Sequence, residues 1–151
     1  LFPYTTLFRS PSEILSKPGR ISDVEMALIK EHAQAGHEML IEAGLPKEFA
    51  LAVGQHHERY NGTGYPNQLN ANEVLLESKI LVVADVVEAM ISHRPYRPAQ
   101  TLETAIQEIE QNKGILYDPE VVDACMRLLR QKNYVVDDTP HKIRITHEEY
   151  D

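Results

Sequence analysis

Residues 56–66 read HHERYNGTGYP. The asparagine, two glycines and proline of residues 61–66 exclude a regular helix or strand, so a loop is predicted there. Two adjacent histidines stand just before that loop, and imidazole is a common ligand of divalent metals. This stretch therefore predicts side chains that can bind a metal ion, placed beside a loop.

The histidine pair is predicted to continue the helix that precedes it. Pro46 suits the first position of a helix, and Phe49, Val53 and His56 follow at i, i+4 and i+7 along one apolar stripe. Neighbouring helical residues point about 100° apart, so His56 and His57 would each meet a different metal or partner within a cluster. The alternative is that His56 is a hydrogen-bonded core histidine and His57 a surface one.

A helix upstream supplies a third candidate ligand, His32. Ser22 and Glu25 form a capping box that opens this helix. Gly36 lies one turn after His32 and would let a backbone or a ligand approach closely, whereas His37 is expected to face solvent. The inner side of the helix is expected to carry Val24, Leu28, Ala35, Met39 and Leu40.

The most apolar helix is predicted over residues 74–92, and it contains Asp85. Valine, leucine and isoleucine surround this carboxylate, and a buried carboxylate is costly unless it is paired or binds metal. Carboxylate and imidazoles together favour iron, manganese or zinc. The alternative is a salt-bridged aspartate on the solvent side of the helix.

Residues 94–98, RPYRP, break that helix and carry two arginines. On a loop stiffened by proline, Arg94 and Arg97 would lose little entropy in clamping phosphate oxygens. Tyr65, between a glycine and a proline, could present its phenol to a base or a phosphate. The alternatives are a solvated surface turn for the arginines and a turn-capping aromatic for Tyr65.

The remaining pattern predicts an all-α domain of ordinary composition. Further helices are expected over residues 101–113 and 118–129, and residues 135–136 and 143–145 suggest a short strand. The net charge of -8 argues against non-specific binding of DNA or RNA. A single cysteine, Cys125, excludes an internal disulfide, and no run of about 18 apolar residues is present, so the cytoplasm is expected.

In order along the chain, the motifs KPG (17–19), HAQAG (32–36), HHERYNGTGYP (56–66), VADVVEAM (83–90) and RPYRPA (94–99) resemble the HD-GYP domain family. The resemblance covers roughly residues 11–130. It divides the chain into an unrelated or unstructured leader over 1–10, the C-terminal portion of an HD-GYP domain over 11–134, and a polar tail over 135–151.

The resemblance implies an HD-domain-like helical bundle that hydrolyses cyclic di-GMP to pGpG or GMP. The family uses two or three iron or manganese ions and a metal-activated hydroxide in bacterial second-messenger signalling. It also implies three groups of residues: metal ligands His32, His56, His57 and Asp85; substrate contacts Tyr65, Arg94 and Arg97; and loop-shaping Glu58, Gly64 and Pro66.

One departure from the family leaves other functions open. The family's His-Asp dyad and its following lysine should stand just before residues 11–15, PSEIL, where this chain has LFPYTTLFRS. An N-terminally truncated copy with weakened metal binding is therefore expected. The alternatives are a non-catalytic module that binds GGDEF-type or adaptor signalling proteins through the GYP loop, and the same fold acting on another cyclic dinucleotide. A homodimer is a further expectation from the family.

Overall fold

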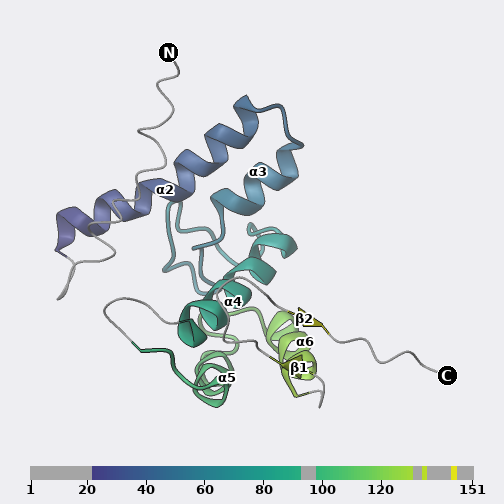
Figure 1. Cartoon of the computed structure of the whole chain (residues 1–151). Coiled ribbons are helices and arrows are strands. Elements are labelled where there is room, and N and C mark those ends of the chain that lie inside the picture. Colours follow the sequence, from purple (N-terminus) through teal and green to yellow (C-terminus); the bar gives the residue numbers. More distant parts are fainter. Residues whose placement is uncertain (1–21, 93–97, 131–133, 136–143, 146–151) are drawn as a thin grey trace.

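The computed structural model describes residues 22–92, 98–130, 134–135 and 144–145 (Figure 1). The regular elements within these ranges are five helices and one two-stranded antiparallel ribbon, so the all-α prediction is confirmed. Of the residues predicted to form a short strand, Val135, Arg144 and Ile145 lie in the ribbon, and Val136 and Ile143 lie outside the described ranges. The predicted boundaries at residues 10 and 134 stay predictions, and residues 1–10 lie outside the described ranges. The elements are α2 (Asp23–Glu42), α3 (Lys47–Gly54), α4 (Leu76–Ile91), α5 (Leu102–Gln111), α6 (Pro119–Leu129), β1 (Tyr134–Val135) and β2 (Arg144–Ile145).

The helix α2 begins at the predicted capping box. The Ser22 hydroxyl accepts a hydrogen bond from the Glu25 N–H at 3.3 Å, and the Glu25 carboxylate accepts one from the Ser22 N–H at 2.8 Å. The helix ends before Gly44, whose φ of +74° lies in the left-handed region that favours glycine. These signals fix where α2 starts and stops.

Two glycines let α2 and α3 pack closely as an antiparallel pair. A Cβ atom at Gly36 would lie 3.0 Å from Cγ1 of Val53, and one at Gly54 would lie 3.1 Å from Cβ of His37. His37 is therefore half-buried against α3, and the prediction that it faces solvent is wrong. The group that approaches Gly36 closely is the Val53 side chain of α3, whereas a backbone or a ligand was predicted there.

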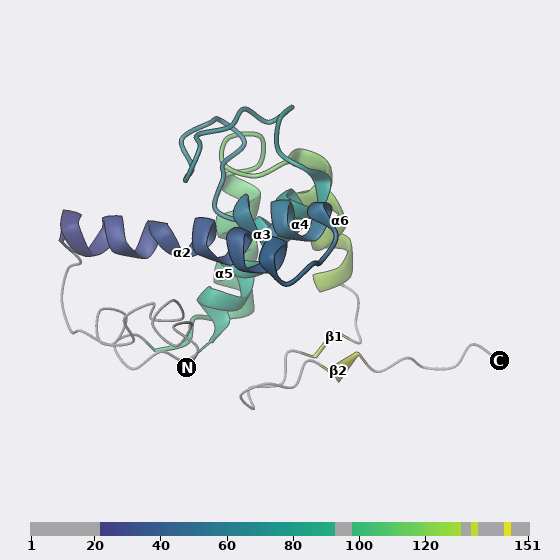
Figure 2. The ribbon, with the colours of Figure 1, turned by 90° about the horizontal axis from the view of Figure 1, so that it is seen from above.

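The first half of α2 departs from its predicted burial. Val24 and Leu28 were expected on the inner side of the helix, but their side chains are 73% and 46% exposed. Figure 2 shows the cause, because this half of α2 projects beyond α3 and the other described helices.

The start of α3 differs from the prediction by one residue. Pro46 was predicted to be the first helical residue, but it is the N-cap of α3, and Lys47 is the first helical residue.

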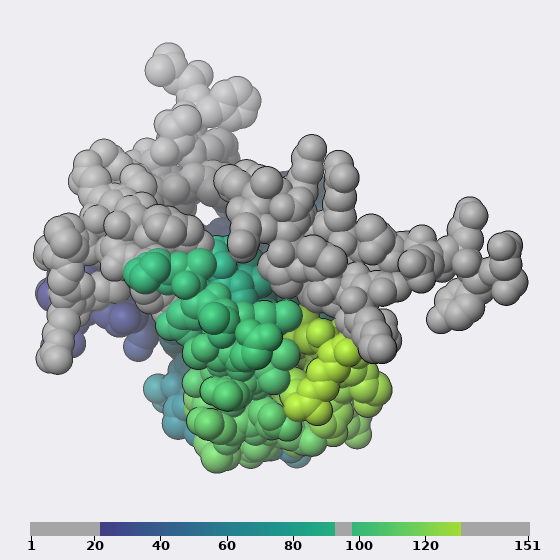
Figure 3. Space-filling model, turned by 60° about the horizontal axis from the view of Figure 1, so that its bottom comes forward, coloured from purple at the N-terminus to yellow at the C-terminus, as the bar shows by residue number. Residues whose placement is uncertain are grey.

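The helices α4, α5 and α6 enclose the main hydrophobic core below the α2–α3 pair (Figure 1). Thr101 caps α5 and Asp118 caps α6, and the two helices lie side by side on the face seen in Figure 3. The core side chains come from all three helices and the turn before α6: Val82, Val83, Val87, Ala105, Ile109, Tyr117, Val121, Val122, Met126 and Leu129.

No helix among the described residues combines the length and apolar character needed to cross a bilayer.

Candidate metal centre

The two adjacent histidines lie in a turn that follows α3. The helix ends at Gly54, and residues 55–57 form the turn, so the prediction that His56 continues the helical stripe is wrong. The buried Gln55 holds the turn, since its side-chain carbonyl accepts hydrogen bonds from the Leu75 N–H and the Ser78 hydroxyl, both at 3.0 Å. This link ties the histidine turn to the start of α4.

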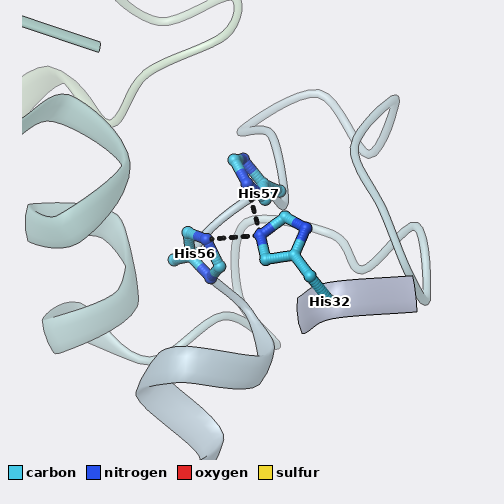
Figure 4. A group of neighbouring side chains, drawn as sticks. All are labelled: His32, His56 and His57. Atoms are coloured by element: carbon cyan, nitrogen blue, oxygen red, sulfur yellow. Dashed lines mark hydrogen bonds between the residues drawn. The ribbon is translucent and has the colours of Figure 1, made fainter. Parts of the chain in front are cut away.

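The turn brings both histidines to His32 on α2 (Figure 4). The Nε2 atom of His32 lies 3.2 Å from Nε2 of His56 and 3.1 Å from Nε2 of His57. The ring centroids of His56 and His57 are only 3.9 Å apart. In a helix the two rings would have diverged, whereas here they face one partner together.

Contacts on the other ring nitrogens determine which atoms carry lone pairs. Nδ1 of His32 contacts the carbonyl oxygen of Ile29, and Nδ1 of His56 contacts that of Val53. A carbonyl can only accept a hydrogen bond, so each Nδ1 must carry the proton and each neutral ring presents an Nε2 lone pair. Two lone pairs that face each other at 3.2 Å repel unless a cation or a shared proton lies between them.

The spacing of these nitrogens fits a divalent metal ion. Metal–imidazole bonds are roughly 2.0 to 2.1 Å long, which separates two neighbouring ligand nitrogens by about 3.0 to 3.4 Å on a shared ion. The two measured separations fall in this range, and ligand atoms of the three histidines lie within 4.8 Å of one another. Donation of the remote ring N–H to a backbone carbonyl is also the usual arrangement of metal-binding histidines.

The environment of His57 keeps its ring neutral and therefore able to bind metal. Burial, the largest cause, and the neighbouring His56, His32 and Arg59 together lower the pKa of His57 to about 3. The ring stacks on Tyr65 with centroids 4.7 Å apart. A neutral imidazole at physiological pH is a lone-pair donor without the need to lose a proton first.

The loop after the histidines is held by Glu58, which is 1% exposed. Its carboxylate accepts hydrogen bonds from the backbone N–H groups of Asn67, at 2.8 Å, and Leu69, at 3.0 Å. Gly64 lies directly against this residue, because a Cβ atom there would be 2.4 Å from the Glu58 Cα atom. The loop is thus folded back onto the residue that follows the histidine pair.

Tyr65 is placed against the metal centre by this loop. Its N–H donates to the His57 carbonyl at 3.2 Å, and the Tyr65–Pro66 peptide bond is cis. Burial raises the pKa of the Tyr65 phenol, the positive charge of Arg59 opposes this effect, and the Asp85 carboxylate raises the pKa further. Tyr65 therefore lies within the electrostatic reach of both charges.

The other predicted site residues stand apart from the histidines or outside the described residues. Asp85 is exposed on α4, so the argument that apolar neighbours bury it is wrong, and it is not part of the three-histidine group. Its role as a metal ligand stays a prediction. Arg94 and Arg97 lie outside the described residues, and their roles stay predictions as well.

Two contributors to the site had no signal in the sequence. Gln55 looks like a polar residue at a helix end, and nothing in its spacing shows that it bonds α4 twenty residues later. Arg59 packs its guanidinium over the Tyr117 ring, 5.3 Å from the centroid, and adds positive charge behind His57. Both act through contacts between distant segments, which no local pattern records.

Comparisons of the sequence and of the structure with known proteins point to the same family. Residues 5–121 match the HD domain family. The crystal structure of a cyclic GMP-AMP specific phosphodiesterase of Vibrio cholerae superposes with a TM-score of 0.58 over 70% of this chain and 25% of that one. At 24% identity this likeness shows the fold alone, and it agrees with the predicted HD-domain bundle.

Curated relatives share more of the sequence. A cyclic di-GMP phosphodiesterase response regulator of Xanthomonas campestris is 40% identical over 78% of this chain. A cyclic di-GMP phosphodiesterase of Thermotoga maritima is 40% identical over 80%, and a 3'3'-cGAMP-specific phosphodiesterase of Vibrio cholerae is 34% identical over 77%. The chain spans 32%, 33% and 25% of these relatives' lengths. The chain belongs to the HD domain family, and the resemblance to HD-GYP proteins that its motifs indicated is confirmed.

Proposed function

We propose that the protein hydrolyses a cyclic dinucleotide, cyclic di-GMP foremost, at a divalent-metal centre around His32, His56 and His57. The observation that carries the proposal is the convergence of three imidazole Nε2 atoms, 3.1 and 3.2 Å apart, from two separate segments. Relatives named as cyclic di-GMP and cGAMP phosphodiesterases support the choice of substrate class.

The donor set favours iron or manganese, with Asp85 as a further ligand. Imidazole and carboxylate together suit these ions. A divalent metal bound there would supply charge to polarise the phosphodiester and would lower the pKa of water. The chain's own contribution is to hold the rings of His32 and His56 by the backbone carbonyls of Ile29 and Val53, so that their Nε2 lone pairs converge.

The residues around the centre would hold the substrate. Tyr65 borders the His57 ring and would seat the nucleotide against the metal centre. Arg94 and Arg97 would orient the phosphates through bidentate hydrogen bonds. The products would be linear pGpG and then GMP.

The test is hydrolysis of cyclic di-GMP and 3'3'-cGAMP by the protein supplied with ferrous iron or manganese. Products are separated by chromatography and bound metal is counted in the same samples. His57→Ala should lose metal and activity together, while Glu42→Gln, which alters an exposed residue of α2 outside the cluster, should keep both. Intact substrate after incubation with the metal-loaded protein would contradict the proposal.

A second candidate is binding of a signalling partner through the GYP loop. Asn61, Thr63 and Asn67 are exposed on a loop that Glu58 holds from beneath, which favours a preformed docking surface. A partner, such as a GGDEF-type domain, that binds equally well after metal removal would favour this function over hydrolysis.

A further inference from the structure

A groove lies between α2 and the loop that carries Tyr65. Its volume is about 270 Å³. One wall is the outer side of α2 and the other is the loop after Gly64. The residues that line it are Ala27, Lys30, Glu31, Gln34, Gly64, Tyr65, Pro66 and Gln68.

The polar groups of this groove are free to meet a ligand. Glu31 and Gln68 make no hydrogen bond or ion pair with any other described residue, and both are exposed. Gln34 donates its amide N–H to Glu38 at 2.7 Å, which leaves its amide oxygen available within the described part of the chain. The Glu31 and Gln68 side chains and the Gln34 amide oxygen thus line one hollow without a hydrogen-bond partner among the described residues.

Tyr65 connects the groove to the metal centre. Its ring stacks on His57 with centroids 4.7 Å apart, and the Lys30 ammonium lies 5.3 Å from the centroid of the same ring. The cation–π contact brings a positive charge to the part of the groove that Tyr65 lines. A ligand that spans both places would put an anionic group near the metal and a neutral group in the groove.

The size of the groove limits what it can hold. Pockets for a whole drug-sized ligand are roughly 300 to 1,000 Å³. At about 270 Å³ the groove falls below this range, so it suits one nucleobase of a cyclic dinucleotide while the phosphates remain outside.

We propose that this groove binds one guanine base of the substrate and that the Glu31 carboxylate selects it. The Watson–Crick edge of guanine presents two neighbouring donors, N1–H and the 2-amino group, which match the two oxygens of a carboxylate. Adenine presents an acceptor at N1 and no 2-amino group, so it would place a lone pair against the same oxygens. The inference rests on the proposed function and adds the residue that distinguishes guanine from adenine.

The test is equilibrium binding of cyclic di-GMP and cyclic di-AMP to the metal-loaded protein, with calcium in place of the catalytic metal to prevent turnover. Glu31→Gln should weaken cyclic di-GMP binding roughly tenfold or more, as expected for loss of a charge-assisted pair, and leave cyclic di-AMP binding nearly unchanged. Glu42→Gln is the matched control, because Glu42 is exposed on the same helix, about 16 Å further along.

The outcomes separate the two proposals. If the wild-type protein prefers cyclic di-GMP and only Glu31→Gln loses that preference, with unchanged metal content, the groove assignment stands. If Glu31→Gln and Glu42→Gln both bind like the wild type, the assignment is overturned while the proposed function survives. If the metal-loaded wild type binds neither dinucleotide, the proposed function fails and the groove assignment fails with it.

Discussion

At His57, burial and three positive or potentially positive neighbours act in the same direction. They lower the pKa of the ring to about 3, well below the ordinary 6.5, so the folded protein resists protonation there. Between these two values the unfolded chain binds a proton that the folded chain does not. Stability of the metal-free protein that depends on His57 is therefore complete above pH 6.5 and is lost progressively as the pH falls toward 3.

The prediction is a pH-dependent loss of stability that His57→Gln reduces. Urea unfolding in the presence of a chelator, at pH values from 7.5 to 5, should show the wild type losing stability more steeply than the variant. Glutamine does not titrate in this window, so the difference between the slopes isolates the ring. Parallel slopes would show that His57 is not held neutral by its surroundings.

The surroundings of Gly64 leave no room for a side chain. A Cβ atom there would lie 2.4 Å from backbone atoms of Glu58 and Arg59, which cannot move without displacing the histidine turn. We expect Gly64→Ala to destabilise the fold by about 2 to 3 kcal/mol and to weaken metal binding, measured by urea unfolding and metal titration.

Gly44→Ala is the control for this prediction. Gly44 has a left-handed φ of +74°, whereas Gly64 has not, and a Cβ atom at Gly44 meets nothing within 4 Å. Its substitution should cost about 1 kcal/mol and leave metal binding unchanged. Equal effects of the two substitutions on metal affinity would contradict the role given to Gly64.

Among the helices, α6 begins with an N-cap that makes both hydrogen bonds and an ion pair. Asp118 accepts hydrogen bonds from the Glu120 N–H at 3.0 Å and the Val121 N–H at 3.3 Å, and it pairs with Lys79 of α4 at 3.1 Å. Burial alone would raise the pKa of Asp118, but the Lys79 and backbone hydrogen bonds lower it overall. Its stabilising effect is complete above pH 3.8 and is lost as the pH falls through the lower folded value.

Asp118→Ala is expected to lower the free energy of unfolding by about 1 to 2 kcal/mol at neutral pH, because a cap and an ion pair between helices are lost together. Thermal and urea unfolding measure the change. Asp123→Ala removes only an exposed ion pair with Lys113 and should cost roughly 0.5 kcal/mol or less. A loss as large for Asp123 as for Asp118 would contradict the capping account.

The sequence predicted the elements well where local chemistry determines them. The capping box of α2 and the caps of α5 and α6 bind their own helices, so their signals are complete within a few residues. The end of α3 was predicted wrongly because the turn at Gln55 is held by hydrogen bonds to the start of α4. The exposure of Asp85 was missed because apolar neighbours in sequence turned to other sides of the helix.

At the scale of the whole molecule, the site depends on two parts of the fold meeting at one place. The α2–α3 pair supplies His32 and the histidine turn, and the α4–α6 core anchors that turn through Gln55. Order and spacing of motifs along the chain indicated which residues would gather. The sequence did not show that three rings would share one point, because that convergence depends on the packing of α2 against α3 at Gly36 and Gly54.

The most direct measurement is a crystal structure of the manganese-loaded protein with anomalous diffraction data collected near the manganese absorption edge. The account predicts an anomalous peak about 2.0 to 2.3 Å from the Nε2 atoms of His32, His56 and His57 together. A fully loaded crystal with no peak at these nitrogens, or with its manganese bound elsewhere, would contradict the claim that the three imidazoles form a metal centre.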